Sequence, residues 1–380
     1  MRHHQYNKSF KFVHRPVEFD KNTEKSLLQY CLGATLYMPG TKFIADKITN
    51  KQLEDITSIV MCFEDAIQET DLDDAEKNVL NTLNIIADAI EKNRISISEV
   101  PLIFIRVRNL TQFQSFTEEI STEQISILSG FVFPKFYCQN AIEYLKEVEY
   151  LSKKHDVKLY SMPLLEGKTI AYKETREEEL ATLRNILQPF KNQILNIRVG
   201  GTDLSSFFGV RRGINYTIYD ILPVNECLAD ILNFFTRSED DYQVSGPVWE
   251  YFLASKKDNI NHLIHENIHA SLVNRVPILD EAIDGLLREV IIDKANGFVG
   301  KTIIHPSHAK FVNAMQAVTK EQYEDAMQII NTQGGVIKSS TSNKMNEINP
   351  HKNWAHKTIL RAKAFGVIDS DMSYLKLIVS

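Results

Sequence analysis

Residues 196–212 read NIRVGGTDLSSFFGVRR, and this stretch decides how the rest of the chain is interpreted. An apolar strand-like run leads here straight into Gly200 and Gly201, and the carboxylate of Asp203 follows. A second carboxylate, Glu166, ends the preceding strand-like run KLYSMPLLE. The glycines let the backbone turn tightly and let a ligand approach it closely. The stretch alone leaves two interpretations open: a ligand site at a strand end, or an ordinary strand end whose aspartate caps a helix.

The chain contains eight short apolar runs, most of them rich in Val, Ile, Phe and Tyr, and helix-like segments separate most of them. This alternation is typical of βα units with a parallel sheet, and eight units favour an α/β protein with a (β/α)₈ TIM barrel. A doubly wound sheet would have fewer strands, and neither GxGxxG nor GxxxxGK[ST] occurs. The predicted strands lie within 33–40, 58–67, 101–109, 130–136, 158–166, 194–203, 242–249 and 297–306.

The character of the sequence changes after the eighth run. The barrel domain is predicted to span 1–315, and a C-terminal helical extension, serving as a lid or an oligomer arm, to span 316–380. Gly and Ser mark a flexible loop inside the extension, and an Asn-Pro pair marks a helix start. The extension is predicted to contain a helix near 320–331, the flexible linker GGVIKSSTSNK at 334–344, and a helix from Asn349 to about Gly366.

The composition predicts a globular protein that binds small molecules. The chain has 380 residues, of which 43% are hydrophobic, with a net charge of −6. It therefore offers no basic surface for nucleic acid or for an acidic membrane. Neither a signal-type apolar segment nor a run of 18 apolar residues occurs, so we predict a cytoplasmic location. The four widely spaced cysteines indicate reduced, buried thiols.

Polar residues gather at the predicted strand ends, which is where a TIM barrel carries its active site. Glu166 and Asp203 suffice as protein ligands for magnesium, or for manganese, because water and substrate complete the coordination shell. His305, which ends the eighth run, is expected to be a hydrogen-bonded scaffold residue. The strand-end residues are Glu64, Asp65, Arg106, Arg108, Lys135, Glu166, Asp203 and His305.

Two arginines are predicted to bind an acidic substrate. Arg106 and Arg108 lie two residues apart, so their side chains share one side unless the strand has already ended. A guanidinium binds a carboxylate in bidentate fashion. The alternative for either arginine is a salt bridge to Glu64 or Asp65, and the alternative for Lys135 is neutralisation of the acids. The predicted substrate-binding residues are Arg106, Arg108, Lys135, Gly201 and Thr202.

A cation held by two acids beside an arginine suits chemistry that develops an enolate. The metal would act as a Lewis acid on a carbonyl oxygen, while the positive charge stabilises the oxyanion as a carbon–carbon bond breaks or forms.

A competing motif, HExxH, spans His265 to His269, with His262 one turn earlier. On a helix the two histidines would share one face, as zinc peptidases require. The pattern specifies only three positions and lacks a glycine-marked third ligand. We therefore expect an exposed helix, with a structural or adventitious metal site as the alternative.

An ordered series of motifs resembles the citrate lyase β-subunit and HpcH/HpaI aldolase superfamily, and within it the TIM-barrel C–C bond lyase branch of tellurium-resistance gene clusters. SGPVWEYF (245–252) and MNEINPHKNWA (345–355) look characteristic of that branch. The shared motifs are LYMPG (36–40), CFEDAI (62–67), IRVRN (105–109), GFVFPK (130–135), PLLEG (163–167), GGTDLSSFFG (200–209) and GFVGKTIIHPSH (297–308).

The resemblance implies a homo-oligomeric barrel, such as a trimer, that binds magnesium through Glu166 and Asp203 and substrate oxygens through Arg106. It further implies a lyase or aldolase acting on a small carboxylated substrate, with a CoA thioester among the options. Gly33 and Ala34 replace the arginine–serine pair that opens the first strand of relatives, so the contact that relatives make through this pair, with CoA as one option, is not expected here. Relatives carry a C-terminal aspartate that reaches a neighbouring subunit, and here Glu347 is the nearest acid.

The predicted function is therefore a magnesium-dependent carbon–carbon lyase of citrate lyase type, with Arg106, Glu64, Asp65 and Glu347 as catalytic residues. One alternative is a hydrolase or transferase of acyl-CoA on the same site. The other is a non-catalytic binding or scaffold subunit of an assembly. For Glu347, the alternative to a catalytic role is an exposed glutamate before a helix.

Overall fold

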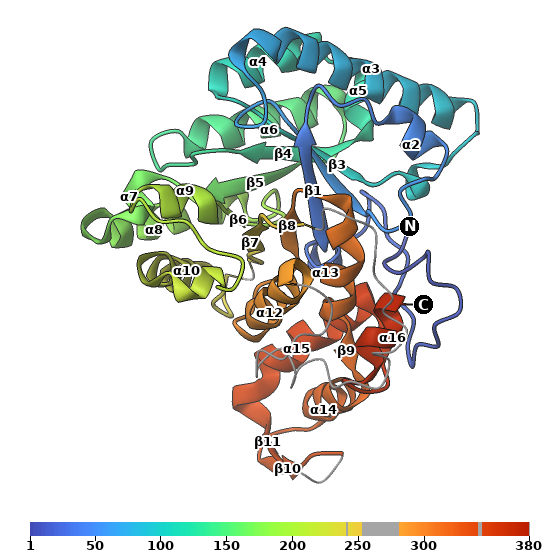
Figure 1. The fold of residues 1–380 in the computed structure, drawn as a ribbon, viewed down its shortest axis with the longest axis vertical. Helices are drawn as coiled ribbons and strands as arrows, with labels where there is room; N and C mark the ends of the chain where they lie inside the picture. Colours follow the sequence, from blue (N-terminus) through green and yellow to red (C-terminus); the bar gives the residue numbers. More distant parts are fainter. Residues whose placement is uncertain (241, 253–280, 341–343, 380) are drawn as a thin grey trace.

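The computed structural model describes residues 1–240, 242–252, 281–340 and 344–379, and Figure 1 shows their arrangement. All eight predicted strands are present and parallel, in the order β6-β5-β4-β3-β2-β1-β8-β7. This confirms the predicted α/β class and TIM barrel. The strands are β1 Ala34–Pro39, β2 Ser58–Cys62, β3 Leu102–Arg106, β4 Leu128–Phe133, β5 Tyr160–Leu165, β6 Arg198–Val199, β7 Gly246–Trp249 and β8 Lys301–Ile303.

The barrel closes between the segments that precede β6 and β7. The backbone N–H of Ile197 donates to the carbonyl of Gln243 at 2.9 Å, and the N–H of Ser245 donates to the carbonyl of Ile197 at 3.0 Å. These two bonds join the strands at the ends of the sheet order. The closure brings β6, which leads to Asp203, beside β7 and β8.

The strands read as continuous apolar runs because both of their faces are buried. Ile59 and Met61 of β2 pack toward the surrounding helices, in the larger hydrophobic core. Val60 lies between them and belongs to the second core, together with Leu102 and Phe104 of β3. Alternate residues of one strand thus enter different cores, as the two-residue period of a strand requires.

Helices surround the barrel and connect its strands (Figure 1). The 20-residue α3 buries Ala75, Val79, Leu83 and Ile86, which recur every three or four residues on one face. The helices before the extension are α1 Lys25–Leu28, α2 Ala45–Thr49, α3 Leu72–Glu91, α4 Leu110–Glu119, α5 Thr122–Ile127, α6 Ala141–His155, α7 Lys168–Ala171, α8 Lys173–Leu187, α9 Gly201–Ser206, α10 Leu222–Phe235, α12 Glu281–Ala295 and α13 Ala309–Gln316.

The C-terminal extension is helical, as predicted, and its two long helices pack on each other. Both helices agree closely with their expected bounds, and α15 is followed by Gly366, whose φ of +85° suits glycine. The elements are β9 Val318–Thr319, α14 Lys320–Asn331, β10 Val336–Lys338, β11 Met345–Glu347, α15 Ile348–Phe365, β12 Val367–Ile368 and α16 Ser373–Val379. The proposed boundary at 315/316 remains a prediction.

The prediction of a flexible linker at 334–344 was wrong in part. Residues 336–338 form β10, which pairs antiparallel with β11. The β-branched Val336 and Ile337 favour a strand, and the Gly334–Gly335 pair, both with positive φ, supplies the turn before it. The polar residues that follow masked this short hairpin in the sequence.

The N-terminal segment lies against the C-terminal extension. The N–H of Val367 in β12 donates to the carbonyl of His14 at 2.7 Å, and the N–H of Val13 donates back to the carbonyl of Val367 at 2.8 Å. Both chain ends accordingly lie on the same side of the molecule in Figure 1.

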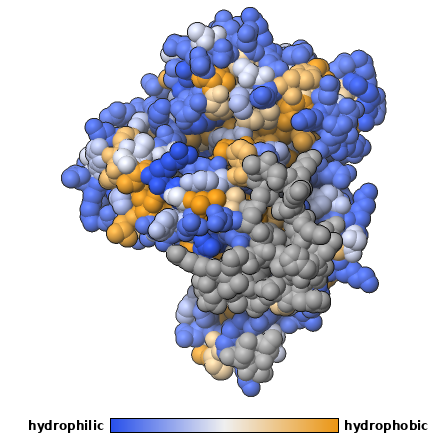
Figure 2. All heavy atoms as spheres, in the orientation of Figure 1, coloured by the Kyte–Doolittle hydropathy of each residue, from blue (hydrophilic) through white to orange (hydrophobic). Residues whose placement is uncertain are grey.

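On the face drawn in Figure 2, hydrophilic side chains predominate and hydrophobic ones form separate patches among them. No helix in the described part of the chain is both long and apolar enough to cross a membrane.

Candidate active site

The carboxyl ends of the strands bring six of the predicted polar residues to one end of the barrel. Parallel strands place their ends at the same edge, so residues that are distant in sequence become neighbours. Each residue lies at the end of its strand or in the segment that follows. They are Glu64 and Asp65 after β2, Arg106 at the end of β3, Lys135 after β4, Glu166 after β5 and Asp203 in α9 after β6.

Arg106 is the centre of this group. Its Nη2 lies 2.7 Å from Glu64 Oε2, 3.2 Å from Asp65 Oδ2 and 3.0 Å from Glu166 Oε1. The guanidinium is buried, as are Glu64 and Glu166, so water screens these two pairs little. The salt bridge that the sequence left open as an alternative is therefore present, and the same contacts hold the guanidinium at the floor of the site.

Glu166 and Asp203 converge on Gly200. Glu166 Oε1 accepts from Arg106 Nη2 and from the backbone N–H of Lys135, both at 3.0 Å, which leaves Oε2 for another ligand. A Cβ placed on Gly200 would lie 2.4 Å from Glu166 Oε2 and 3.2 Å from Asp203 Oδ2. The two carboxyl groups thus face the same small space beside this glycine, where a hydrogen bond to Glu166 acts to lower the pKa of Asp203.

The charges of this pair suit a cation. Burial raises the pKa of Glu166 to about 8, with Arg106 opposing and the charge of Asp203 adding to the rise. Burial likewise raises the pKa of Asp203, and the charge of Asp65 adds to it. Two acids that resist ionising side by side gain a partner when a divalent cation binds between them. A site with two carboxylates suits magnesium, because water and substrate complete its coordination shell. The described residues contain no group of three or more His, Cys, Asp or Glu arranged for a metal.

Lys135 reaches across the site to Glu64. Its Nζ lies 2.7 Å from Glu64 Oε1, so the neutralising contact weighed from the sequence is present. Lys135 has a φ of +47°, an uncommon conformation for a residue with a side chain. In that conformation the backbone N–H of Lys135 donates a hydrogen bond to Glu166, while the side chain of the same residue reaches Glu64.

The other predicted substrate residues lie near the group but make different contacts. Because β3 ends at Arg106, the side chain of Arg108 leaves the strand direction, and its Nη1 donates to the carbonyl of Phe63 at 3.2 Å. Gly201 is buried against Pro247, whereas the hydroxyl of Thr202 donates to Glu250 at 3.1 Å. Their binding roles remain predictions.

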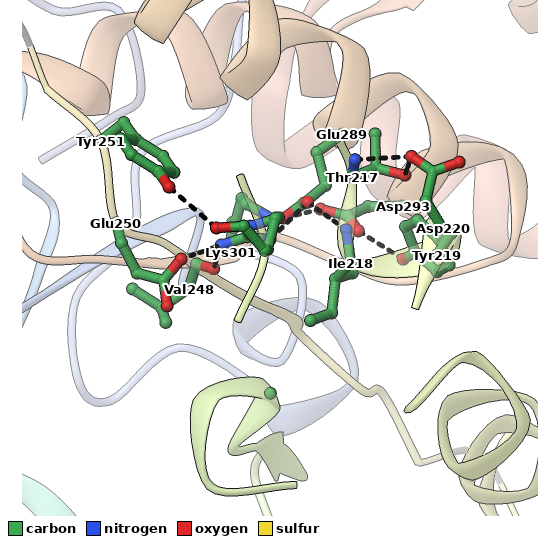
Figure 3. A network of polar contacts seen from close by, with 12 residues as sticks. Thr217, Ile218, Tyr219, Asp220, Val248, Glu250, Tyr251, Glu289, Asp293 and Lys301 are labelled. Carbon is green, nitrogen blue, oxygen red and sulfur yellow. Dashed lines mark hydrogen bonds and ion pairs between the residues drawn. The ribbon is translucent and has the colours of Figure 1, made fainter. Parts of the chain in front are cut away.

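A buried charge network, which the sequence analysis missed, links the start of β8 to the segment that follows β7. Figure 3 shows Glu289 and Asp293 of α12 pointing toward Lys301 of β8, whose Nζ lies 2.8 Å from each. Arg212 pairs with Glu289 and, at 2.8 Å, with Glu250, the residue that accepts from Thr202 beside Asp203. The spacing of Glu289 and Asp293, four residues apart on a mostly apolar helix, was the available signal.

Three further predictions have different outcomes. The HExxH motif at His265–His269 lies outside the described residues. His305 Nδ1 contacts the hydroxyl of Ser307 at 2.6 Å, and its ring stacks on Phe252, contacts that suit a scaffold residue. Glu347 is exposed and ends β11, which lies far from β3 and β5 within one chain (Figure 1). Action of Glu347 on a neighbouring copy remains a prediction.

The fold and the site define an enzyme-like TIM barrel with an acidic site at the carboxyl ends of its strands. The chain belongs to the family described as C–C bond lyase of the TIM-barrel fold, whose model matches residues 26–367. This confirms the predicted family, and the protein is a carbon–carbon lyase. No curated protein matches the chain significantly.

Solved structures that are similar to this chain include two bacterial proteins. CitE from Mycobacterium tuberculosis, solved with magnesium, acetoacetate and coenzyme A, has 14% identity and a TM-score of 0.52, covering 88% of this chain and 99% of its own. RipC from Yersinia pestis has 12% identity and a TM-score of 0.44, covering 76% and 95%. At these identities the first comparison supports the barrel alone, and the second, with its lower score, adds nothing to it.

Replacing Gly200 tests the space between the two acids. Gly200→Ala should weaken magnesium binding by about 10- to 100-fold, the usual cost of disturbing the support of a metal ligand. The added Cβ would meet Glu166 Oε2 at 2.4 Å, while the backbone at Gly200, with a φ of −91°, accepts alanine. Calorimetric titration with magnesium measures the change. Gly213→Ala is the control, since its Cβ would meet only Tyr216 at an ordinary 3.5 Å. Equal affinity in the two variants would contradict this placement of the cation.

Proposed function

We propose that this protein is a magnesium-dependent lyase that cleaves or forms a carbon–carbon bond in a small β-hydroxy acid skeleton through an enolate. The observation that carries the proposal is the convergence of two carboxylate oxygens, Glu166 Oε2 and Asp203 Oδ2, on one space beside Gly200. Bound there, magnesium would polarise a substrate carbonyl oxygen. Manganese would suit the same oxygen ligands.

Arg106 is proposed to hold and orient the substrate's carboxylate. Glu64, Asp65 and Glu166 all contact Nη2, so the guanidinium is positioned before substrate arrives. A buried arginine held in this way loses little conformational freedom on binding, which favours the correct orientation of the reacting bond. Its charge also stabilises the oxyanion that develops.

Asp65 is the proposed proton acceptor. Its side chain is 53% exposed, so substrate can reach it, whereas Glu64 is buried. Burial raises the pKa of Asp65, but hydrogen bonding to Glu64 and the charge of Arg106 outweigh this effect and bring the pKa below its ordinary value. An ionised Asp65 can take the proton from the β-hydroxyl while the carbon–carbon bond breaks and its electron pair enters the enolate. The proton that later reaches the enolate carbon is assigned to Glu347 of a second copy in a homo-oligomer.

Product analysis distinguishes cleavage from the alternative reactions. The protein is incubated with magnesium and carbon-labelled β-hydroxy acids, offered as free acids and as CoA thioesters, and the products are separated by mass. We expect two carbon fragments that appear only with magnesium, and about 10²-fold less product from Arg106→Lys, which keeps the charge but loses the planar fork. Arg94→Lys, at a 56% exposed side chain, is the control. Release of CoA with an intact carbon skeleton would instead establish a hydrolase.

A further inference from the structure

A second cavity lies at the opposite end of the barrel from the acidic site. Its volume is about 340 Å³, and it opens where α15 packs under the barrel. Gln243 and Val299, which precede β7 and β8, contribute to its wall, so the cavity is at the amino ends of the strands. In Figure 1, α15 lies below the barrel in the same region as α12 and β9. The cavity therefore shares no lining residue with the acidic cluster.

The wall of this cavity is rich in positive charge. Lys294 of α12 and Lys357 and Arg361 of α15 all line it, and the lining contains no aspartate or glutamate. Trp354, 41% exposed, adds an aromatic surface one turn before Lys357 and two turns before Arg361. A cavity with cations, an indole and no acid is suited to an anion that has an apolar part.

The charge of Lys294 has no carboxylate partner among the described residues. Its Nζ donates to the carbonyls of Met315 and Ala317 at 3.0 and 2.5 Å and to the hydroxyl of Tyr374 at 3.0 Å. Three acceptors match the three donors of an ammonium group, yet all three are neutral. Burial lowers the pKa of Lys294 well below its ordinary value, Arg361 lowers it further, and Asp371 acts in the opposite direction. An anion in the cavity would favour the charged ammonium form of Lys294 and raise that pKa.

Two buried donors of the lining also lack acceptors. Arg361 donates from Nη2 to the carbonyl of Phe298 at 3.0 Å, but its Nε is buried without a partner. Gln243 is 1% exposed, and its Nε2 is likewise unpaired. Buried polar groups are usually satisfied in folded proteins, so an acceptor bound in the cavity would suit these two donors.

We propose that this cavity binds an organic phosphate, with the phosphate beside Lys357 and Arg361 and an aromatic or other flat apolar portion against Trp354. A phosphate fits better than a single carboxylate, because it offers several strong acceptor oxygens and up to two negative charges to several cations. The volume lies within the range of small-molecule pockets. The site is distinct from the lyase site and does not depend on the function proposed for it.

Tryptophan fluorescence can measure this binding directly. The chain has two tryptophans, and Trp249 is fully buried, so a ligand at the cavity mouth should change the signal of Trp354. Phenyl phosphate is titrated into the full-length protein at constant ionic strength without magnesium. We expect saturable binding, weakened at least about tenfold in Lys357→Met through loss of one charge-assisted contact. Lys352→Met, an exposed lysine of the same helix, is the control and should bind as wild type.

Further arms of the experiment identify which part of the ligand is recognised. Phenol should bind at least about tenfold more weakly than phenyl phosphate if the anion is required. Calorimetry with Trp354→Leu should show weakened phenyl phosphate binding but unchanged binding of inorganic phosphate. A thermal midpoint equal to wild type shows that each variant is folded. No saturation by phenyl phosphate at millimolar concentration, or equal weakening in Lys352→Met and Lys357→Met, would overturn the proposal.

Discussion

Glu166→Gln and Asp203→Asn are each expected to abolish magnesium binding and to lower magnesium-dependent turnover by at least about 10³-fold. A bound metal that acts as a Lewis acid contributes several kcal/mol to the transition state, and each 1.36 kcal/mol is a factor of ten in rate. Each variant removes one of the two oxygens that face Gly200. Calorimetric titration measures the metal, and product formation from labelled β-hydroxy acids measures the rate.

The folded state should survive Glu166→Gln. Because burial, reinforced by Asp203 and opposed by Arg106, raises the pKa of Glu166 to about 8, the folded apo protein favours the neutral carboxyl at neutral pH. An uncharged amide therefore resembles the group already present, and the thermal midpoint without magnesium should equal or exceed that of wild type.

Adding magnesium with pyruvate should then stabilise wild type but neither variant. Wild type should gain about 2.7 kcal/mol at a hundredfold excess over the dissociation constant, and neither variant should gain anything. Glu118→Gln, an exposed carboxylate on α4, is the control and should behave as wild type. Undiminished magnesium affinity in both Glu166→Gln and Asp203→Asn would remove the metal site from the proposed mechanism.

Lys301→Met is expected to lower the free energy of unfolding by about 3–5 kcal/mol. Removing one partner of a buried ion pair leaves charge uncompensated in a region that water does not reach. Here one ammonium serves both Glu289 and Asp293 at 2.8 Å, and all three side chains are 0% exposed (Figure 3). Urea unfolding followed by circular dichroism measures the loss. Lys153→Met, in an exposed pair with Glu149, should change stability by less than about 1 kcal/mol.

A double variant separates lost charge from lost packing. Adding Asp293→Asn to Lys301→Met removes one of the stranded carboxylates while keeping its shape, so part of the stability should return. The interaction energy is the stability change of the double variant minus the sum of the two single changes, and it reports coupling between neighbouring groups. If the double variant were as unstable as the sum of the two single variants, charge compensation would not explain the network.

The local course of the chain could be predicted from the sequence in most places. Each of the eight apolar runs overlaps one of the eight strands, and α15 ends just before Gly366, where a glycine was expected to stop the helix. Such features depend on neighbours along the chain, because burial of both faces requires a continuous apolar run and a left-handed residue favours glycine. The exception was β10, where a three-residue strand inside a polar stretch depends on its pairing with β11.

The membership of the acidic group also followed from the sequence. Once eight parallel strands are recognised, their carboxyl ends must meet at one edge, which brings Arg106, Glu166 and Asp203 into one region. This argument places residues in a region but does not pair them. The guanidinium of Arg106 contacts three acids, and Lys135 presents its backbone to Glu166 and its side chain to Glu64.

The sequence by itself determined the barrel, its strands and the end of the barrel that carries the acids, because these follow from periodicity and from chain direction. Only the tertiary structure decided which charges pair, which carboxylate oxygens converge beside Gly200, and how Lys301 contacts Glu289 and Asp293 of α12. It also decided that α15 closes a positively charged cavity at the far end of the barrel. Such contacts depend on distances and rotamers between elements remote in sequence, for which the hydrophobic pattern of a single segment carries no information.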